Sequence, residues 1–106
     1  MNDTKTQESG QAQRRIVETI FCLAGHELMG LSTVEVQRAL DRKHASLVTR
    51  DLQVLLDMGV AEQVPETGRW RLGPRMVRIA RDFEIALQKA ASRVKEIEQR
   101  YTRSGA

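Results

Sequence analysis

Hydrogen-bonding side chains gather on one side of a predicted amphipathic helix that runs from residue 44 or 45 to residue 58. Val48, Leu52, Leu55 and Leu56 recur every three or four positions and predict its buried face. The outer positions near its start are His44, Ser46, Leu47, Thr49, Arg50 and Gln53. Arginine can bind a guanine edge, serine and threonine can bond bases or phosphate, and leucine can contact a thymine methyl group. We therefore predict that Ser46, Leu47, Thr49 and Arg50 read DNA bases; an ordinary polar surface is the alternative.

A short capped helix is predicted just before this segment. The run Ser32-Thr33-Val34-Glu35 has the pattern of a capping box, in which serine and glutamate side chains satisfy each other's backbone amides. This helix ends near residue 40, and residues 41–43 form a break. Two short helices around a tight break predict a helix-turn-helix. The free amides at a helix start also favour phosphate, although capping alone explains Ser32.

A β-hairpin is predicted over residues 60–72. The run Pro65-Glu66-Thr67-Gly68 predicts its turn, because proline can start a turn and glycine can adopt a positive φ. By strand alternation Trp70 faces the domain, while Arg69 and Arg71 face the other side. These arginines would flank the tip of a wing, near DNA phosphates or a minor groove.

The predicted first helix, residues 14–24, supports the helix-turn-helix. Its apolar residues recur at helical spacing: Ile16, Val17, Ile20, Phe21, Leu23 and Ala24. Residues 1–12 are polar and without periodicity, which predicts a disordered arm. Residues 13–73 are thus predicted to form one winged helix-turn-helix DNA-binding domain, so that the fold class is mainly α with a small β-hairpin.

The last predicted helix, residues 74–103, begins at a proline and carries a long apolar repeat. Its spacings alternate between four and three, giving a heptad seam of Met76, Ala80, Phe83, Leu87, Ala90, Val94, Ile97 and Tyr101. A helix rising about 1.5 Å per residue would outrun a three-helix domain. We predict that it forms a dimerisation coiled coil with a second copy through Phe83, Leu87, Ala90, Val94, Ile97 and Tyr101. Parallel and antiparallel pairing both remain open, and folding back over its own domain is the alternative.

The charge of the chain is modest but unevenly distributed. The net charge of +3 over 106 residues is too small to argue for nucleic acid alone. Five arginines fall within 13 positions: Arg69, Arg71, Arg75, Arg78 and Arg81. Such a cluster is typical of a phosphate-binding surface, and a solvated helical face is the alternative.

Several other classes of protein are disfavoured by the sequence. The one cysteine, Cys22, permits no internal disulfide, and no apolar segment is long enough for a membrane span or a signal region. A cytoplasmic location is therefore predicted. His26 has no partner at metal-ligand spacing, and no nucleophile–base set or glycine-rich phosphate loop is present. We expect neither a metal or cofactor nor enzymatic activity.

Two runs of sequence resemble the N-terminal winged helix-turn-helix of IclR-type transcriptional regulators. They are Ala45-Ser46-Leu47-Val48-Thr49-Arg50-Asp51-Leu52, followed by Leu55 and Gly59-Val60, and Gly68-Arg69-Trp70-Arg71-Leu72-Gly73-Pro74-Arg75. In that family the recognition helix opens with a small hydroxylic residue and carries an arginine four positions on, which correspond here to Ser46 and Arg50. The resemblance covers about residues 14–82, and the Leu-Gly-Pro-Arg exit of the wing is its most specific part.

The chain departs from this family in two respects. The family usually has glycine in the turn between the two helices, and Arg42 aligns with that position here. Members also normally carry a large C-terminal effector-binding domain, whereas this chain stops after a helix. We accordingly expect no small-molecule effector.

Together these features predict a homodimeric, sequence-specific DNA-binding regulator, a repressor that acts on an inverted-repeat operator in double-stranded DNA. The predicted phosphate or wing contacts are Ser32, Thr33, Arg42, Lys43, Arg69, Arg71 and Arg75. The alternative is a winged-helix adaptor that pairs with another protein through its C-terminal helix. Strong, salt-dependent DNA affinity would distinguish the regulator from the adaptor.

Overall fold

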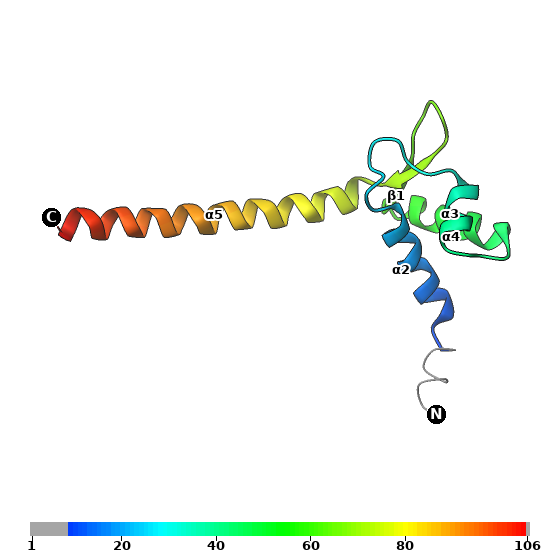
Figure 1. The fold of residues 1–106 in the computed structure, drawn as a ribbon, viewed down its shortest axis with the longest axis horizontal. Helices are drawn as coiled ribbons and strands as arrows, with labels where there is room; N and C mark the ends of the chain where they lie inside the picture. Colours follow the sequence, from blue (N-terminus) through cyan, green and yellow to red (C-terminus); the bar gives the residue numbers. More distant parts are fainter. Residues whose placement is uncertain (1–8, 106) are drawn as a thin grey trace. The chain divides into compact units, whose positions relative to one another are not determined.

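The computed structural model describes residues 9–105 as four helices and a two-stranded sheet (Figure 1). In chain order the elements are α2 (Gln11–Leu23), α3 (Thr33–Ala39), α4 (Ala45–Asp57), β1 (Ala61–Gln63), β2 (Trp70–Leu72) and α5 (Pro74–Gly105). This confirms the predicted mainly α fold, a winged helix-turn-helix followed by a long C-terminal helix. The described residues divide into two compact units, with the boundary between Met76 and Val77.

Helix α2 begins three residues before the predicted start. Residues 1–8 of the predicted arm lie outside the described residues, whereas Gln11 is already helical. Thr19 and Leu23 are buried, and the Thr19 hydroxyl donates to the Arg15 carbonyl at 2.8 Å. That bond satisfies a buried polar group within the helix itself. Gly25, at φ 91°, follows the helix and turns the chain away.

Helix α3 is short, and the predicted capping box fixes its start. The Glu35 amide donates to Ser32 Oγ at 3.1 Å, and the Ser32 amide donates to Glu35 Oε1 at 2.9 Å. The bond from the Ser32 amide holds the pKa of the half-buried Glu35 carboxyl below its usual range. Val36 on the inner face is fully buried. Local capping and one anchoring side chain therefore place the helix.

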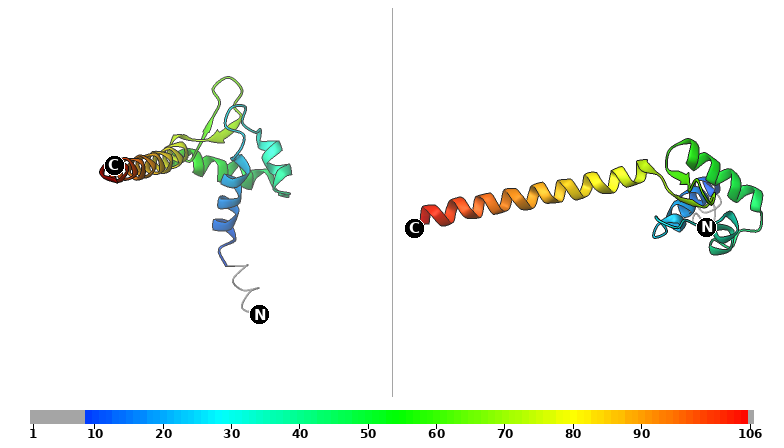
Figure 2. Two further views of the ribbon diagram at one scale, coloured as in Figure 1. Left: turned by 60° about the vertical axis from the view of Figure 1, so that its left-hand side comes forward. Right: turned by 90° about the horizontal axis from the view of Figure 1, so that it is seen from above.

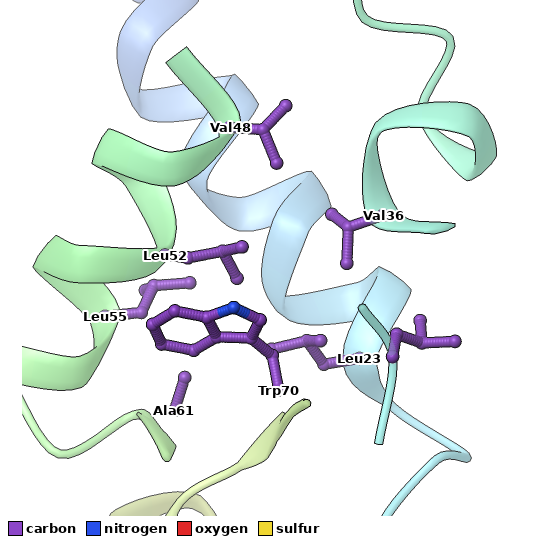
Figure 3. Close-up of a cluster of buried hydrophobic side chains, with 8 residues drawn as sticks. Leu23, Val36, Val48, Leu52, Leu55, Ala61 and Trp70 are labelled. Atoms are coloured by element: carbon purple, nitrogen blue, oxygen red, sulfur yellow. The ribbon is translucent and has the colours of Figure 1, made fainter. Parts of the chain in front are cut away.

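The core of the first unit is built around Trp70, which is only 5% exposed. Figure 3 shows its indole ring among Leu52 and Leu55 of α4 and Ala61 of β1, with Leu23 of α2 nearby. Its indole N–H donates to Thr33 Oγ1 at 3.2 Å, so the polar edge of the ring is satisfied as its apolar body is buried. One side chain thus joins the hairpin to all three helices of the domain.

The hairpin pairs antiparallel, with Ala61 opposite Leu72, Glu62 opposite Arg71 and Gln63 opposite Trp70. Both strands are shorter than predicted, three residues each. Trp70 is also bridged on its other side to Leu31, through two N–H···O bonds of 2.7 Å. The segment before α3 therefore pairs with β2 at Leu31, on the side of the strand away from β1.

Two glycines are required where backbones approach closely. A Cβ on Gly30, at φ 71°, would lie 2.7 Å from the Trp70 carbonyl oxygen. A Cβ on Gly73 would lie 2.6 Å from the Gly59 carbonyl oxygen. Both positions permit tight packing around the hairpin, and Gly73 directs the chain out of the wing into α5.

Helix α5 is one continuous helix of 32 residues, drawn from yellow to red in Figure 2. Pro74 opens it, as expected for a residue without an N–H at the first helical position. Its apolar seam is exposed: Phe83 67%, Leu87 55%, Val94 55%, Ile97 43% and Tyr101 74%. Among the described residues, no helix is both long enough and apolar enough to span a membrane.

Candidate nucleic-acid interface

The outer face of α4 near its start carries exposed hydrogen-bonding side chains. Burial of Val48, Leu52 and Leu55 fixes the rotation of the helix. As a result Ser46, Thr49, Arg50 and Gln53 are all exposed. Leu47 differs from its predicted exposure: it is half-buried, and it lines a cleft between α4 and α2. These four exposed side chains therefore share one face of α4, and Leu47 lies at the edge of that face.

A buried ion pair holds α4 against α2 behind this face. Arg15 donates to Asp51 through Nε at 2.6 Å and through Nη2 at 3.2 Å. Asp51 is only 3% exposed, and its hydrogen bond raises the pKa of the Arg15 guanidinium. Asp51 immediately follows Arg50, so the pair fixes the backbone from which Arg50 projects.

The turn between α3 and α4 contains a non-glycine residue with a positive φ. Asp41, not Arg42, has the left-handed conformation in which glycine is favoured, with φ 51°. Arg42 instead closes the turn: its amide donates to the Gln37 carbonyl at 3.0 Å, and its own carbonyl accepts from Gln37 Nε2 at 3.1 Å. The Arg42 guanidinium pairs with Glu18 of α2. Lys43, the next residue, is exposed.

Two arginines, Arg69 just before strand β2 and Arg71 within it, bond the wing to neighbouring segments. Arg69 contacts Glu35 at 2.7 Å, and it donates to the carbonyls of Met29 at 3.1 Å and Gly30 at 3.0 Å. Arg71 donates to Glu62 across the hairpin at 2.8 Å. Glu62, a charged residue in a short strand, is thus paired with a cross-strand arginine. Both predicted wing residues thus have a structural function and are half-buried.

The other predicted phosphate ligands lie at the beginning of α3 and of α5. Ser32 Oγ and Thr33 Oγ1 each accept a hydrogen bond inside the domain, and the Ser32 hydroxyl also bonds the Glu35 carboxyl, so of the two only the Thr33 hydroxyl proton is left to be donated elsewhere. Arg75 is exposed, and one of its guanidinium nitrogens donates to the Met58 carbonyl at 3.2 Å. Within residues 9–105, no group of three potential ligands could hold a metal ion.

The fold and this face define a winged helix-turn-helix domain. Among solved structures, the chain is similar to that of the repressor BlcR from Agobacterium tumefaciens, with a TM-score of 0.54 and 26% sequence identity. The match covers 74% of this chain and 30% of the BlcR chain, in its N-terminal domain. This confirms the resemblance to the winged helix-turn-helix of IclR-type regulators. No protein-family model and no curated protein sequence gave a match.

Proposed function

We propose that the protein is a sequence-specific, homodimeric DNA-binding regulator that represses transcription from an inverted-repeat operator. The observation that carries this proposal is the exposed polar face at the start of α4, which the Arg15–Asp51 pair holds in place. A rigidly supported helix with outward arginine and hydroxyl groups suits the major groove. The likeness to a repressor over the same domain supports the proposal.

Base reading is assigned to Ser46, Leu47, Thr49 and Arg50. Arg50 has the five guanidinium donors that match the two acceptors of a guanine edge. Ser46 and Thr49 are exposed, and Thr49 Oγ1 donates to the Ala45 carbonyl at 3.1 Å, which leaves its oxygen able to accept from a base. Half-buried Leu47 would offer only part of its side chain to a thymine methyl group.

Phosphate contacts are assigned to the basic and hydroxylic groups that flank this face. Lys43 is exposed at the start of α4, Ser32 and Thr33 lie at the start of α3, and the Thr33 hydroxyl proton can be donated to a phosphate. Arg42, Arg69 and Arg71 are engaged in internal pairs. Arginine has five donors, so Arg69, Arg71 and Arg75 can each also reach a phosphate while holding an internal partner.

Dimerisation is assigned to the seam on α5. A lone helix with Phe83, Leu87 and Tyr101 more than half exposed leaves a long apolar stripe in water. A second copy supplies a matching stripe, because a heptad repeat is complementary to itself. Ala90, Val94 and Ile97 continue the same stripe.

The same exposed seam favours a second candidate function, an adaptor that pairs with a different helical protein. A selection from random DNA duplexes at about 150 mM salt separates the two functions. We expect enrichment of an inverted repeat, because two identical domains read two identical half-sites. Weak, uniform binding without enrichment would refute the regulator and leave the adaptor.

A further inference from the structure

A basic cleft of about 370 Å³ lies beside the base-reading face, between α2, the α3–α4 turn and the start of α4. Its walls include Arg14, Arg15, Arg42 and Lys43, four positive side chains, with Glu18 as the one carboxylate. His44 and Leu47 of the α4 start complete the wall next to the exposed helix face. A concave surface with an excess of positive charge favours an anion.

Internal pairing leaves this excess of positive charge in place. Arg15 is neutralised by buried Asp51, and Arg42 is paired with Glu18. Arg14 also lines the cleft, and the exposed Lys43 adds a further positive charge to it. Arg42 Nε is buried and has no hydrogen-bond partner among the described residues, which is unusual for a guanidinium donor.

The location of the cleft indicates which anion it would bind. Leu47 belongs to the cleft wall, whereas its neighbour Ser46 and nearby Arg50 point to solvent. A ligand in the cleft would therefore lie next to whatever α4 reads. DNA carries phosphates along both edges of the major groove, and contacts to them fix the register of a recognition helix.

We propose that this cleft holds one backbone phosphate of the DNA that α4 reads, with Lys43, Arg14 and Arg42 as its positive walls. The inference rests on the proposed function and adds Arg14 and the cleft to it. Glu18 competes with the phosphate for the guanidinium of Arg42. Its carboxylate therefore lowers the affinity for DNA of every sequence, because it both occupies Arg42 and repels the incoming phosphate.

The test compares two variants in opposite directions, Lys43→Ala and Glu18→Gln, on the full chain. Lys43→Ala is expected to weaken binding to specific and random duplexes alike, and to reduce the salt slope of log affinity by about 0.9. The ratio of wild-type to variant affinity should thus shrink by about 3–4-fold between 50 and 200 mM salt. Glu18→Gln is expected to tighten binding to both duplexes. The control Glu84→Gln on α5 makes the same change in net charge outside the cleft and is expected to bind like wild type.

The outcomes distinguish the cleft from the function on which it rests. If the wild-type chain binds no DNA, the proposed function fails, and the cleft assignment fails with it. If the wild type binds but Lys43→Ala keeps its salt slope and Glu18→Gln binds no tighter than Glu84→Gln, only the cleft assignment is overturned. Inorganic phosphate that shifts the amide signals of residues 42–44, together with unchanged DNA binding by Lys43→Ala, would assign the cleft to a free anion instead.

Discussion

Asp51 is a charged residue on the buried face of α4, between Val48 and Leu52. A carboxylate there is tolerated because Arg15 offers it two hydrogen bonds and an opposite charge. The Arg15 side chain is 22% exposed and that of Asp51 is 5% exposed, so water screens the pair only in part. Removing one partner leaves the other charge desolvated, which makes the pair a sensitive point of the domain.

We expect Asp51→Ala to lower the free energy of unfolding by about 2–4 kcal/mol, because it strands the Arg15 guanidinium against the core. Urea denaturation followed by circular dichroism measures this loss. Asp57→Ala, an exposed aspartate on the same helix, is the control and should stay within about 0.5 kcal/mol of wild type. Equal stability of the two variants would show that the ion pair does not hold α4 on α2.

At the residue scale, the sequence predicts which side chains are exposed where exposure depends on helix periodicity alone. Ser46, Thr49 and Arg50 are exposed because Val48 and Leu52 are buried, and that pattern is visible in the sequence. The partners of Arg42 and Asp51 were missed, because each partner lies on α2, 24 and 36 positions away respectively. Contacts over such separations leave no local pattern in one sequence.

At the element scale, local signals predicted the helix and strand order well. The capping box starts α3, and alternation around a proline–glycine turn gives the hairpin. The start of α2 was missed because Gln11, Ala12 and Gln13 are all exposed and contribute nothing to an apolar repeat. A helix end that extends into solvent lacks the periodicity by which helices are recognised.

Helix α5 provides a test of pairing at the element scale. Leu87→Asp places a charge in the seam, and burying it unpaired in each of two helices should raise the dimer dissociation constant at least about tenfold. Sedimentation velocity across a concentration series measures the change. Ile85→Asp is the matched control, because Ile85 lies on α5 outside the seam and receives the same substitution. A wild-type monomer at all concentrations, or equal disruption by both variants, would contradict pairing through the seam.

At the scale of the whole molecule, the chain joins a winged helix-turn-helix to a long helix with an exposed apolar seam. The likeness to BlcR covers less than a third of that repressor's chain. The proposed function therefore rests on three features of this chain: the α4 face, proposed to read DNA bases, the basic cleft, proposed to bind a phosphate, and the α5 seam, proposed to pair with a second copy. Of these, base reading by α4 is the claim on which regulation of particular genes depends.

The most direct test of that claim is the sequence preference of Arg50→Ala, obtained by repeating the random-duplex selection and by titrating the wild-type site and its single-base variants. We expect this variant to lose about 1–3 kcal/mol on the wild-type site and to become indifferent at one base position in each half-site. Lys95→Ala, which removes a positive charge from α5, should keep the wild-type preference. Equal weakening of every sequence by Arg50→Ala, with the same preferred site as wild type, would show that Arg50 does not read a base.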